Sequence, residues 1–296
     1  MKRSISPKEL AKAIGASESS VKRWCDNGSI VTSYTPGGHR KIEVNEALQF
    51  LRNSRYVLEV PEQLGLPVSV GKRQWTSEQA VTFVLEALVD HQEEAVNSLV
   101  MDLYLSGRSL ASIFDEVLRV AFADIGDEWE CGRLEIHKER QACQMCRRVI
   151  DQLRQVARVS NARFSALGGT LSEDYYELPT LMIETVLRDH GWNAMSLGTN
   201  LPASSFSKAV ETQKPDLVWL SLSHVADRER AVTAVNELWE QLDSTVPLIV
   251  GGRALTEELR RDIRYTVYCD TVGQLEDFLQ SYHRNRASSE TNPSLN

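Results

Sequence analysis

The sequence predicts a multidomain protein of the α and α/β classes: a winged helix-turn-helix, a four-helix bundle, and a flavodoxin-like Rossmann domain with a five-stranded parallel sheet. Three observations lead to this prediction. Two short helical patterns joined by a turn lie in a basic N-terminal region, helical periodicity then extends to residue 160, and five short apolar runs finally alternate with helical stretches.

The chain of 296 residues is long enough for two or three domains, each with its own core. Changes in composition and periodicity set the expected boundaries. We assign 1–56 to the winged helix-turn-helix, 57–75 to a linker, 76–160 to the bundle, 161–284 to the Rossmann domain and 285–296 to a polar, disordered tail.

Charge is distributed unevenly along the chain. The net charge is −8, but the first 56 residues carry ten Lys and Arg against five Asp and Glu, so that region has +5 and the rest −13. A basic head on an acidic body is typical of a module that meets phosphates, joined to a body that does not. No stretch approaches the roughly 18 uncharged apolar residues of a membrane span or has the character of a signal peptide, so we expect a cytoplasmic protein. The five cysteines do not form a disulfide pattern and are expected to be reduced.

The first two elements form a helix-turn-helix. Ser6 and Pro7 start a short helical pattern that ends at Gly15, and Ser17 starts a second that ends at Gly28. Tyr34 to Lys41 then supplies a turn with two glycines and several basic side chains, and residues 44–51 return to helical spacing.

Residues 3–54 resemble the DNA-binding domain of the MerR family, on the evidence of Lys22-Arg23-Trp24, Gly28 and Thr35-Pro36-Gly37-Gly38-His39-Arg40. The resemblance implies that the second helix enters the major groove of promoter DNA and that the turn is the wing. We expect Trp24 to be a core residue that sets the second helix and not a DNA contact. One such head makes few contacts, so a homo-oligomer, dimer or tetramer, is expected on two half-sites of double-stranded DNA. The expected DNA contacts are Ser19, Ser20, Lys22, Arg23, Tyr34, His39, Arg40 and Lys41.

Four helical patterns follow the linker. They run from Ser77 to Val89, from Ala95 to Leu103, from Leu110 to Ala121 and over 133–160, with short connections that favour a bundle. Cys143 and Cys146 lie on the last of these; a metal or redox site and two buried core thiols both fit this spacing, and the core is the commoner case. Glu139 lies on the same apolar stripe and is either paired with an arginine or a ligand.

The five apolar runs predict a parallel sheet with ligand-binding loops at its carboxyl edge. They are 164–167, 194–197, 217–221, 248–250 and 266–269. Three loops at this edge carry a spaced pattern: Asp174, Tyr176 and Pro179, then Ser221-Leu222-Ser223 after a gap of 41 residues, then Gly251-Gly252 after a further 27.

This spacing resembles that of cobalamin-binding Rossmann domains, and Trp129, Gly132, Ile136 and Glu139 resemble the helical cap of the cobalamin-dependent photoreceptor repressors that control carotenoid genes. Tyr176 stands where that family has its cobalt-ligating histidine, and Arg140 replaces the histidine of the cap. The resemblance implies a ligand pocket formed by Trp129, Glu139, Arg140, Asp174, Tyr176, Ser221, Ser223, Gly251 and Gly252.

The cofactor is left open because Tyr176 argues against cobalamin. The alternatives are an empty vestigial site, a reshaped pocket, which includes a cobalamin held without the lower histidine, and a haem or bilin site, since a phenolate can ligate haem iron. We expect a DNA-binding repressor whose C-terminal region controls oligomerisation or senses light or a tetrapyrrole. A ligand-independent regulator controlled by a protein partner is the alternative. A cobalamin-dependent enzyme subunit is disfavoured, because no catalytic set is found beside the basic head.

Overall fold

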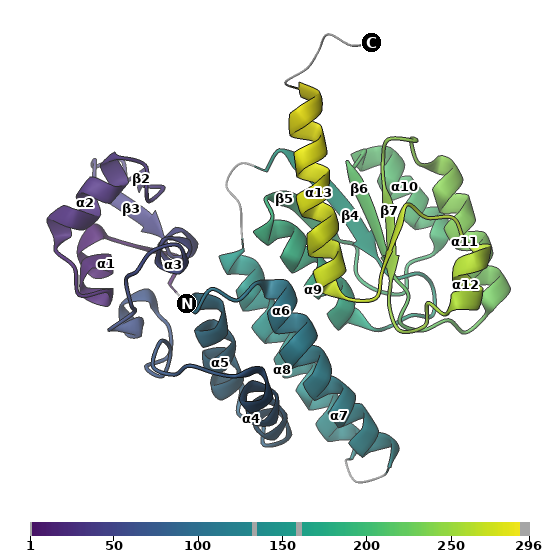
Figure 1. Ribbon diagram of the computed structural model, residues 1–296, viewed down its shortest axis with the longest axis horizontal. Coiled ribbons are helices and arrows are strands. Elements are labelled where there is room, and N and C mark those ends of the chain that lie inside the picture. The colour runs from purple at the N-terminus through teal and green to yellow at the C-terminus, as the bar shows by residue number, and fades with distance from the viewer. Residues whose placement is uncertain (1, 132–134, 158–161, 291–296) are drawn as a thin grey trace. The chain divides into compact units, whose positions relative to one another are not determined.

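The computed structural model describes residues 2–131, 135–157 and 162–290 (Figure 1). The chain divides into two compact units, Met1–Val156 and Ala157–Asn296. Among the described residues, none of the helices combines the length and apolar character that a membrane crossing requires.

Unit 1 begins with two short capped helices, α1 (Pro7–Ala13) and α2 (Glu18–Asp26). Ser6 and Glu9 form a capping box on α1, and Ser17 accepts a hydrogen bond from the backbone N–H of Ser20 at the start of α2. Three strands pair antiparallel in the order β1-β3-β2, and α3 follows β3 directly in the chain. Their bounds are β1 (Ser4–Ile5), β2 (Ser33–Tyr34), β3 (Arg40–Glu43) and α3 (Val44–Arg52).

Residues 57–75, expected to be a linker, are a packed part of unit 1 in the structure. They contain a short 3₁₀ helix, η1 (Pro61–Leu64), which contacts α1. Five apolar side chains of this segment are buried: Leu58, Pro61, Leu64, Leu66 and Val70. Their irregular spacing follows neither helical nor strand periodicity, which is why the sequence pattern does not reveal their burial.

The rest of unit 1 is helical. Helix α4 (Ser77–Val89) packs against α5 (Glu93–Leu105), α7 (Arg119–Glu130) and α8 (Ile136–Val156). The third predicted helix continues beyond residue 121, because α6 (Leu110–Ile113) leads through a π-helical turn, η2 (Phe114–Leu118), directly into α7. The wider turn keeps Phe114, Val117 and Leu118 all buried.

Unit 2 contains the predicted five-stranded parallel sheet, which is confirmed. The strands are β4 (Phe164–Gly169), β5 (Trp192–Ser196), β6 (Leu217–Ser221), β7 (Leu248–Gly251) and β8 (Val267–Cys269). Their order, β5-β4-β6-β7-β8, is that of a flavodoxin-like sheet. The order reverses between β4 and β6, so the loops after these strands face each other at the carboxyl edge.

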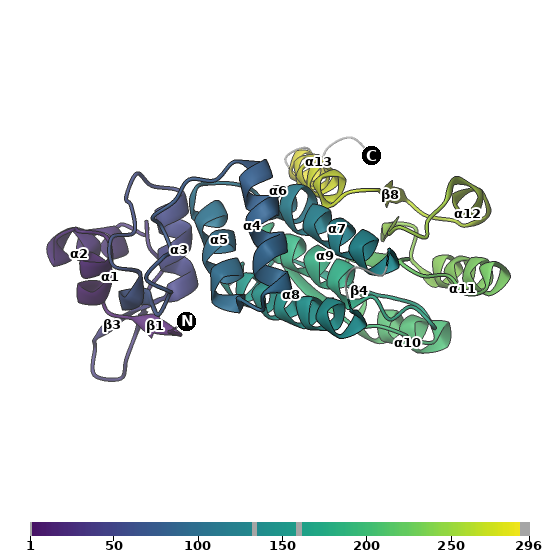
Figure 2. The same cartoon turned by 90° about the horizontal axis from the view of Figure 1, so that it is seen from below.

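Helices cover both faces of this sheet (Figures 1 and 2). Helices α9 (Glu177–Asp189) and α13 (Val272–Glu290) lie on one face, and α10 (Ala203–Gln213), α11 (Arg228–Gln241) and α12 (Glu257–Asp262) contribute to the core on the other. Successive side chains of β6 point to opposite faces of the sheet, and those of Val218 and Leu220 lie in the core on the α10–α12 side. Helix α13 runs through 285–290, which the sequence analysis assigned to a disordered tail; 291–296 lie outside the described residues.

Candidate functional site

The three motif loops meet at the carboxyl edge of the parallel sheet, where the order of the strands reverses. The loop after β4 carries Asp174 and Tyr176, the loop after β6 carries Ser223, and the loop after β7 carries Gly252. Hydrogen bonds join all three loops directly, as described next. The topology therefore brings together the unit 2 residues that the sequence pattern singled out.

Asp174 holds the loops after β4 and β6 together. Its side chain is buried, with 1% exposed, and its Oδ2 atom accepts hydrogen bonds from the backbone N–H groups of Ser223 (2.6 Å) and His224 (3.1 Å). The other carboxylate oxygen accepts from the N–H of Tyr176 at 3.0 Å. Hydrogen bonds to a charged acceptor are the stronger kind, so this carboxylate stabilises the edge of the sheet. In this arrangement it orients backbone, not a ligating side chain.

Tyr176 is the residue before α9 and pairs with an arginine from the third loop. Its hydroxyl oxygen accepts a hydrogen bond from Nη2 of Arg253 at 2.5 Å, and the guanidinium carbon lies 4.4 Å from the centre of the Tyr176 ring. The Nε atom of Arg253 also donates to the carbonyl oxygen of Ser223 at 3.3 Å. Such a stacked, hydrogen-bonded cation and ring are mutually stabilising. Arg253 is not among the predicted pocket residues, although its position directly after Gly251-Gly252 places it on one of the motif loops.

The interior beneath these loops is filled by Trp219 of β6. Its indole has no exposed surface and donates from Nε1 to the Thr180 hydroxyl on α9 at 2.9 Å. Gly168, its partner on β4, has no side chain because a Cβ there would lie 1.9 Å from the indole. A group entering between β4, β6 and α9 therefore meets a packed aromatic ring.

The two glycines after β7 are required by the protein's own backbone. A Cβ on Gly251 would lie 2.6 Å from the carbonyl oxygen of Cys269, and one on Gly252, which has φ +115°, would lie 2.5 Å from that of Leu222. Ser221, 1% exposed, completes the edge with its hydroxyl 3.4 Å from that of Ser223.

These residues do not fit a cobalamin held through a lower axial ligand. The phenol at position 176 is engaged by Arg253, the Asp174 carboxylate is occupied by backbone N–H groups, and Trp219 fills the space inside. Among the described residues of this edge, no buried side-chain polar atom lacks a partner and points to a missing ligand. The same engagement of the phenol argues against a haem held by Tyr176.

The residues expected from the helical cap lie in unit 1. Glu139 on α8 pairs with its neighbour Arg140 at 3.6 Å and accepts a hydrogen bond from the Cys143 thiol at 3.2 Å. Burial, with the nearby Glu139, raises the pKa of Cys143 to about 12, and burial also raises the pKa of Cys146. Both thiols therefore stay protonated and unreactive at neutral pH. The side chain of Trp129, the remaining expected pocket residue, lies outside the described part of the structure.

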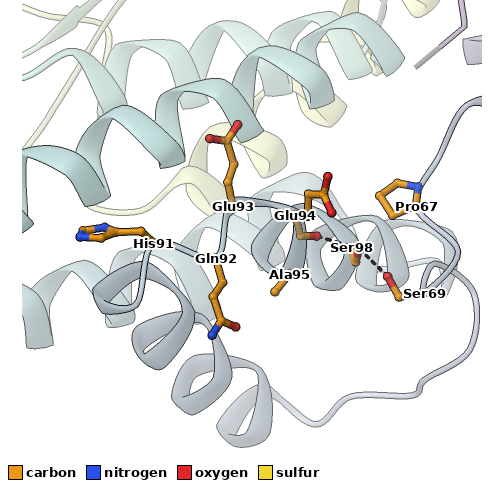
Figure 3. Close-up of a pocket in the computed structure, with 8 residues that line it drawn as sticks. All are labelled: Pro67, Ser69, His91, Gln92, Glu93, Glu94, Ala95 and Ser98. Atoms are coloured by element: carbon orange, nitrogen blue, oxygen red, sulfur yellow. Dashed lines mark hydrogen bonds between the residues drawn. The ribbon is translucent and has the colours of Figure 1, made fainter.

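Metal chemistry finds no support in the part of the chain that the structure describes, where no group of three or more His, Cys, Asp or Glu side chains could hold an ion. A cavity of about 560 Å³ lies elsewhere in unit 1, at the start of α5 (Figure 3). Three of its polar side chains have partners: Ser69 donates to Ser98 at 2.7 Å, and Glu93 pairs with Arg148 at 2.6 Å. None of the residues predicted for the ligand pocket lines it.

Residues 3–54, here called the head, carry the predicted DNA-contacting side chains, which fall into two groups. Arg23, His39 and Lys41 are exposed, and Lys22 is exposed and pairs with Glu18 at 2.8 Å. The other group is engaged within the head. Arg40 pairs with Asp26 at 2.5 Å and donates to the hydroxyl of Tyr34, which ties the β2–β3 hairpin to α2.

Ser19 and Ser20 also have partners within the head. Each places its hydroxyl 2.9 Å from that of Ser17, at the cap of α2. Trp24, expected to be a core residue, is half-buried and packs against Phe50 and Tyr56 with tilted rings, both at 4.9 Å between ring centres.

Comparison with known proteins gives two sets of relatives. A family model described as a B12 binding domain matches residues 84–154. The HTH-type transcriptional repressor CarH of Myxococcus xanthus is 30% identical over 155 residues, 52% of each chain, and CarA of the same organism is 26% identical over 128 residues, 43% of this chain and 44% of CarA. The match thus spans about half the length of these relatives. It confirms the predicted resemblance to a transcriptional repressor with a B12-binding-like region.

The second set covers more of the chain at lower identity. Trimethylamine corrinoid protein 2 of Methanosarcina acetivorans is 19% identical over 213 residues, 69% of this chain and 98% of the relative. The solved structure of the monomethylamine corrinoid protein of Methanosarcina barkeri aligns with a TM-score of 0.57 at 15% identity, covering 70% of this chain and all of that one. This likeness supports the helical and Rossmann-like fold.

Proposed function

We propose that this chain is a sequence-specific DNA-binding repressor. Residues 3–54 are its MerR-type winged helix-turn-helix, residues 76–160 are a four-helix bundle, and unit 2 is a B12-binding-like region that works without histidine-ligated cobalamin. The observation that carries the proposal is the set of exposed basic side chains on α2 and the β2–β3 hairpin, in a chain that resembles the repressors CarH and CarA.

The structure of the head supports different roles for its basic residues. Arg23 and Lys41 are exposed, and the exposed pair of Lys22 with Glu18 is weak in water, so these three are the phosphate or base contacts. Arg40 and Tyr34 hold the wing against α2 and act through its position. Ser19 and Ser20 define the first turn of α2.

Assembly and signal follow from the same reasoning. A single head of this size makes too few contacts for high affinity, and two heads on two half-sites are needed. The repressor therefore acts on double-stranded promoter DNA as a dimer or tetramer. Since a cobalamin held through a lower axial ligand does not fit the sheet edge, a protein partner is the source of the signal that we favour. At the sheet edge, Tyr176 pairs with Arg253 and Asp174 pairs with the backbone of Ser223, so these side chains are occupied within the protein. This also supports a regulator over an enzyme subunit.

DNA binding by the intact chain tests the proposal. A duplex is first selected from a random pool, and its affinity is then measured by fluorescence anisotropy over a range of salt concentrations. Arg23→Ala removes a contact, so we expect weaker binding and, if the contact is to phosphate, a salt slope that is smaller by about one. Arg119→Ala, which removes an exposed arginine of α7, is the matched control. Equal affinity of the wild type, Arg23→Ala and Lys41→Ala for selected and random duplexes contradicts the proposal.

A further inference from the structure

Residues 57–75, here called the strap, join the head to the helices of unit 1 and are fastened at both ends. At the first end, the carbonyl oxygen of Ala13 on α1 accepts hydrogen bonds from the backbone N–H groups of Glu59 (2.8 Å) and Val60 (3.0 Å). The carbonyl oxygen of Leu64 accepts from the N–H of Lys2 at 3.2 Å. These bonds tie the strap to the start of the chain and to the end of α1.

The second end is fastened to α5 through Asp102, whose side chain is only 6% exposed. One carboxylate oxygen accepts from the backbone N–H of Gly71 at 2.5 Å, and the other accepts from the indole N–H of Trp75 at 3.1 Å. Ser69 adds a hydrogen bond to Ser98, also on α5, at 2.7 Å. A buried carboxylate with two donors from one segment fixes that segment in position, because releasing it leaves a buried charge without partners.

The head is also fastened to the helices directly. The guanidinium of Arg52, the last residue of α3, lies 4.4 Å from the centre of the buried Tyr104 ring on α5 and donates to the carbonyl oxygen of Arg108 at 3.0 Å. The side chain of Arg108 in turn donates to the carbonyl oxygen of Trp75 at 3.1 Å and to the hydroxyl of Ser77 at 2.9 Å. The head, the end of the strap and the start of α4 thus share one set of contacts.

A fastened strap and a flexible one have different consequences for DNA binding. A flexible segment of 19 residues spans about 24 Å between its ends on average and lets each head reorient freely. Heads on such tethers accept half-sites at several spacings. Heads fixed to their helices meet only half-sites whose separation and rotation match the assembly, since B-DNA makes one turn in about 10.5 base pairs.

We propose that the strap makes the head and the helices of unit 1 one rigid body, and that Asp102 and Arg52 are positioning residues that set the half-site spacing the repressor accepts. This inference rests on the proposed function. It assigns spacing selectivity to side chains that are not predicted to contact DNA, and it replaces the linker expected over residues 57–75 with a fixed segment.

Amide hydrogen exchange on the intact chain without DNA tests the rigidity. We expect the amides of Glu59, Val60 and Gly71 to be protected, and Asp102→Asn to lower the protection of Gly71 while that of Glu59 persists, because asparagine leaves one acceptor oxygen for the two donors. Asp90→Asn, at the exposed end of α4, is the matched control. Exchange of all three wild-type amides at the rate of an unstructured chain overturns the proposal.

Spacing selectivity is then measured on a synthetic duplex that carries the two half-sites selected by the intact protein. Insertion of five base pairs between them turns one site by about half a helical turn, and we expect the wild type to lose about a hundredfold in affinity as simultaneous engagement is lost. In Asp102→Asn and Arg52→Lys the loss shrinks below about tenfold, because the heads can then reorient. Arg55→Lys, an exposed residue beside Arg52, keeps the wild-type profile.

The outcomes separate the inference from the function on which it rests. A general folding defect lowers affinity for every spacing equally and leaves the ratio between spacings at its wild-type value, which contradicts the positioning role. Protected amides with spacing-tolerant wild-type binding overturn the spacing role alone. Protected amides in a protein that binds neither selected nor random duplexes overturn the proposed function, and the spacing role with it.

Discussion

Replacement of Asp174 by asparagine distinguishes a structural carboxylate from one reserved for a ligand. In the structure its oxygens accept three backbone N–H groups, two on Oδ2 and one on Oδ1. Asparagine keeps one acceptor oxygen and turns an NH₂ group toward the remaining donor. A hydrogen bond to a charged group contributes about 1.5–3 kcal/mol, and a buried unpaired donor adds a cost of similar size. We therefore expect Asp174→Asn to lower the free energy of unfolding of unit 2 by about 3 kcal/mol.

Urea unfolding followed by tryptophan fluorescence measures this change, because Trp192 and Trp219 are buried in unit 2. With a slope of about 2 kcal/mol per molar urea, a loss of 3 kcal/mol lowers the midpoint by about 1.5 M. Asp243→Asn is the matched control: this exposed aspartate also accepts from a backbone N–H, that of Thr245 at 2.9 Å, and its replacement should shift the midpoint by less than about 0.5 M. An unchanged or raised midpoint in Asp174→Asn refutes the reasoning, since residues kept for a ligand often reduce stability.

Gly252→Ala should destabilise unit 2 by more than about 2 kcal/mol, because its Cβ meets the carbonyl oxygen of Leu222 at 2.5 Å, whereas Gly191→Ala, at φ +84° with open space around it, should cost about 1 kcal/mol in the same urea assay. After incubation with adenosylcobalamin in the dark and gel filtration, we expect no retained corrinoid absorbance, because Arg253 engages the Tyr176 phenol and Trp219 fills the interior beneath the loops; a stoichiometric cobalamin spectrum contradicts this expectation. Glu9, whose pKa is lowered to about 2 chiefly by its hydrogen bond from the Ser6 backbone, stabilises the head above its ordinary pKa of 4.5, and this contribution is lost as the pH falls through about 2. The Glu9→Gln variant should therefore show a smaller fall in stability over that pH range than the wild type, measured by urea unfolding at each pH.

The sheet could be predicted from the sequence because local and global signals agree in it. Each strand is a short apolar run bounded by helical stretches, and parallel sheets are buried on both faces, so their strands read as continuous apolar segments. The strap could not be predicted. Its buried residues, such as Leu64 and Val70, pack through a 3₁₀ turn and irregular chain, and its fastening depends on Asp102, which lies 31 residues beyond Gly71. No periodicity encodes such a contact.

The candidate site, like the fold, could be predicted from the sequence only in part. The spacing of Asp174, Ser221 and Gly251 predicts which loops meet, because strand order determines which loops are neighbours. It does not predict what the side chains do there. The pairing of Tyr176 with Arg253 joins residues 77 positions apart, and the packing of Trp219 on Gly168 depends on the register between two strands. Both are tertiary contacts that no local pattern specifies.

The persistence of the fingerprint without its ligating histidine has a physical explanation. The loops after β6 and β7 interlock: the N–H of Leu222 donates to the carbonyl oxygen of Gly251 at 2.7 Å, and the N–H of Ala254 donates to that of Leu222 at 3.0 Å. Gly252 lies so close to this crossing that any side chain would collide with it. The glycines are thus required by the backbone whether or not a ligand binds. Their spacing is evidence of topology, whereas the residue at position 176 and its partner are evidence of the ligand.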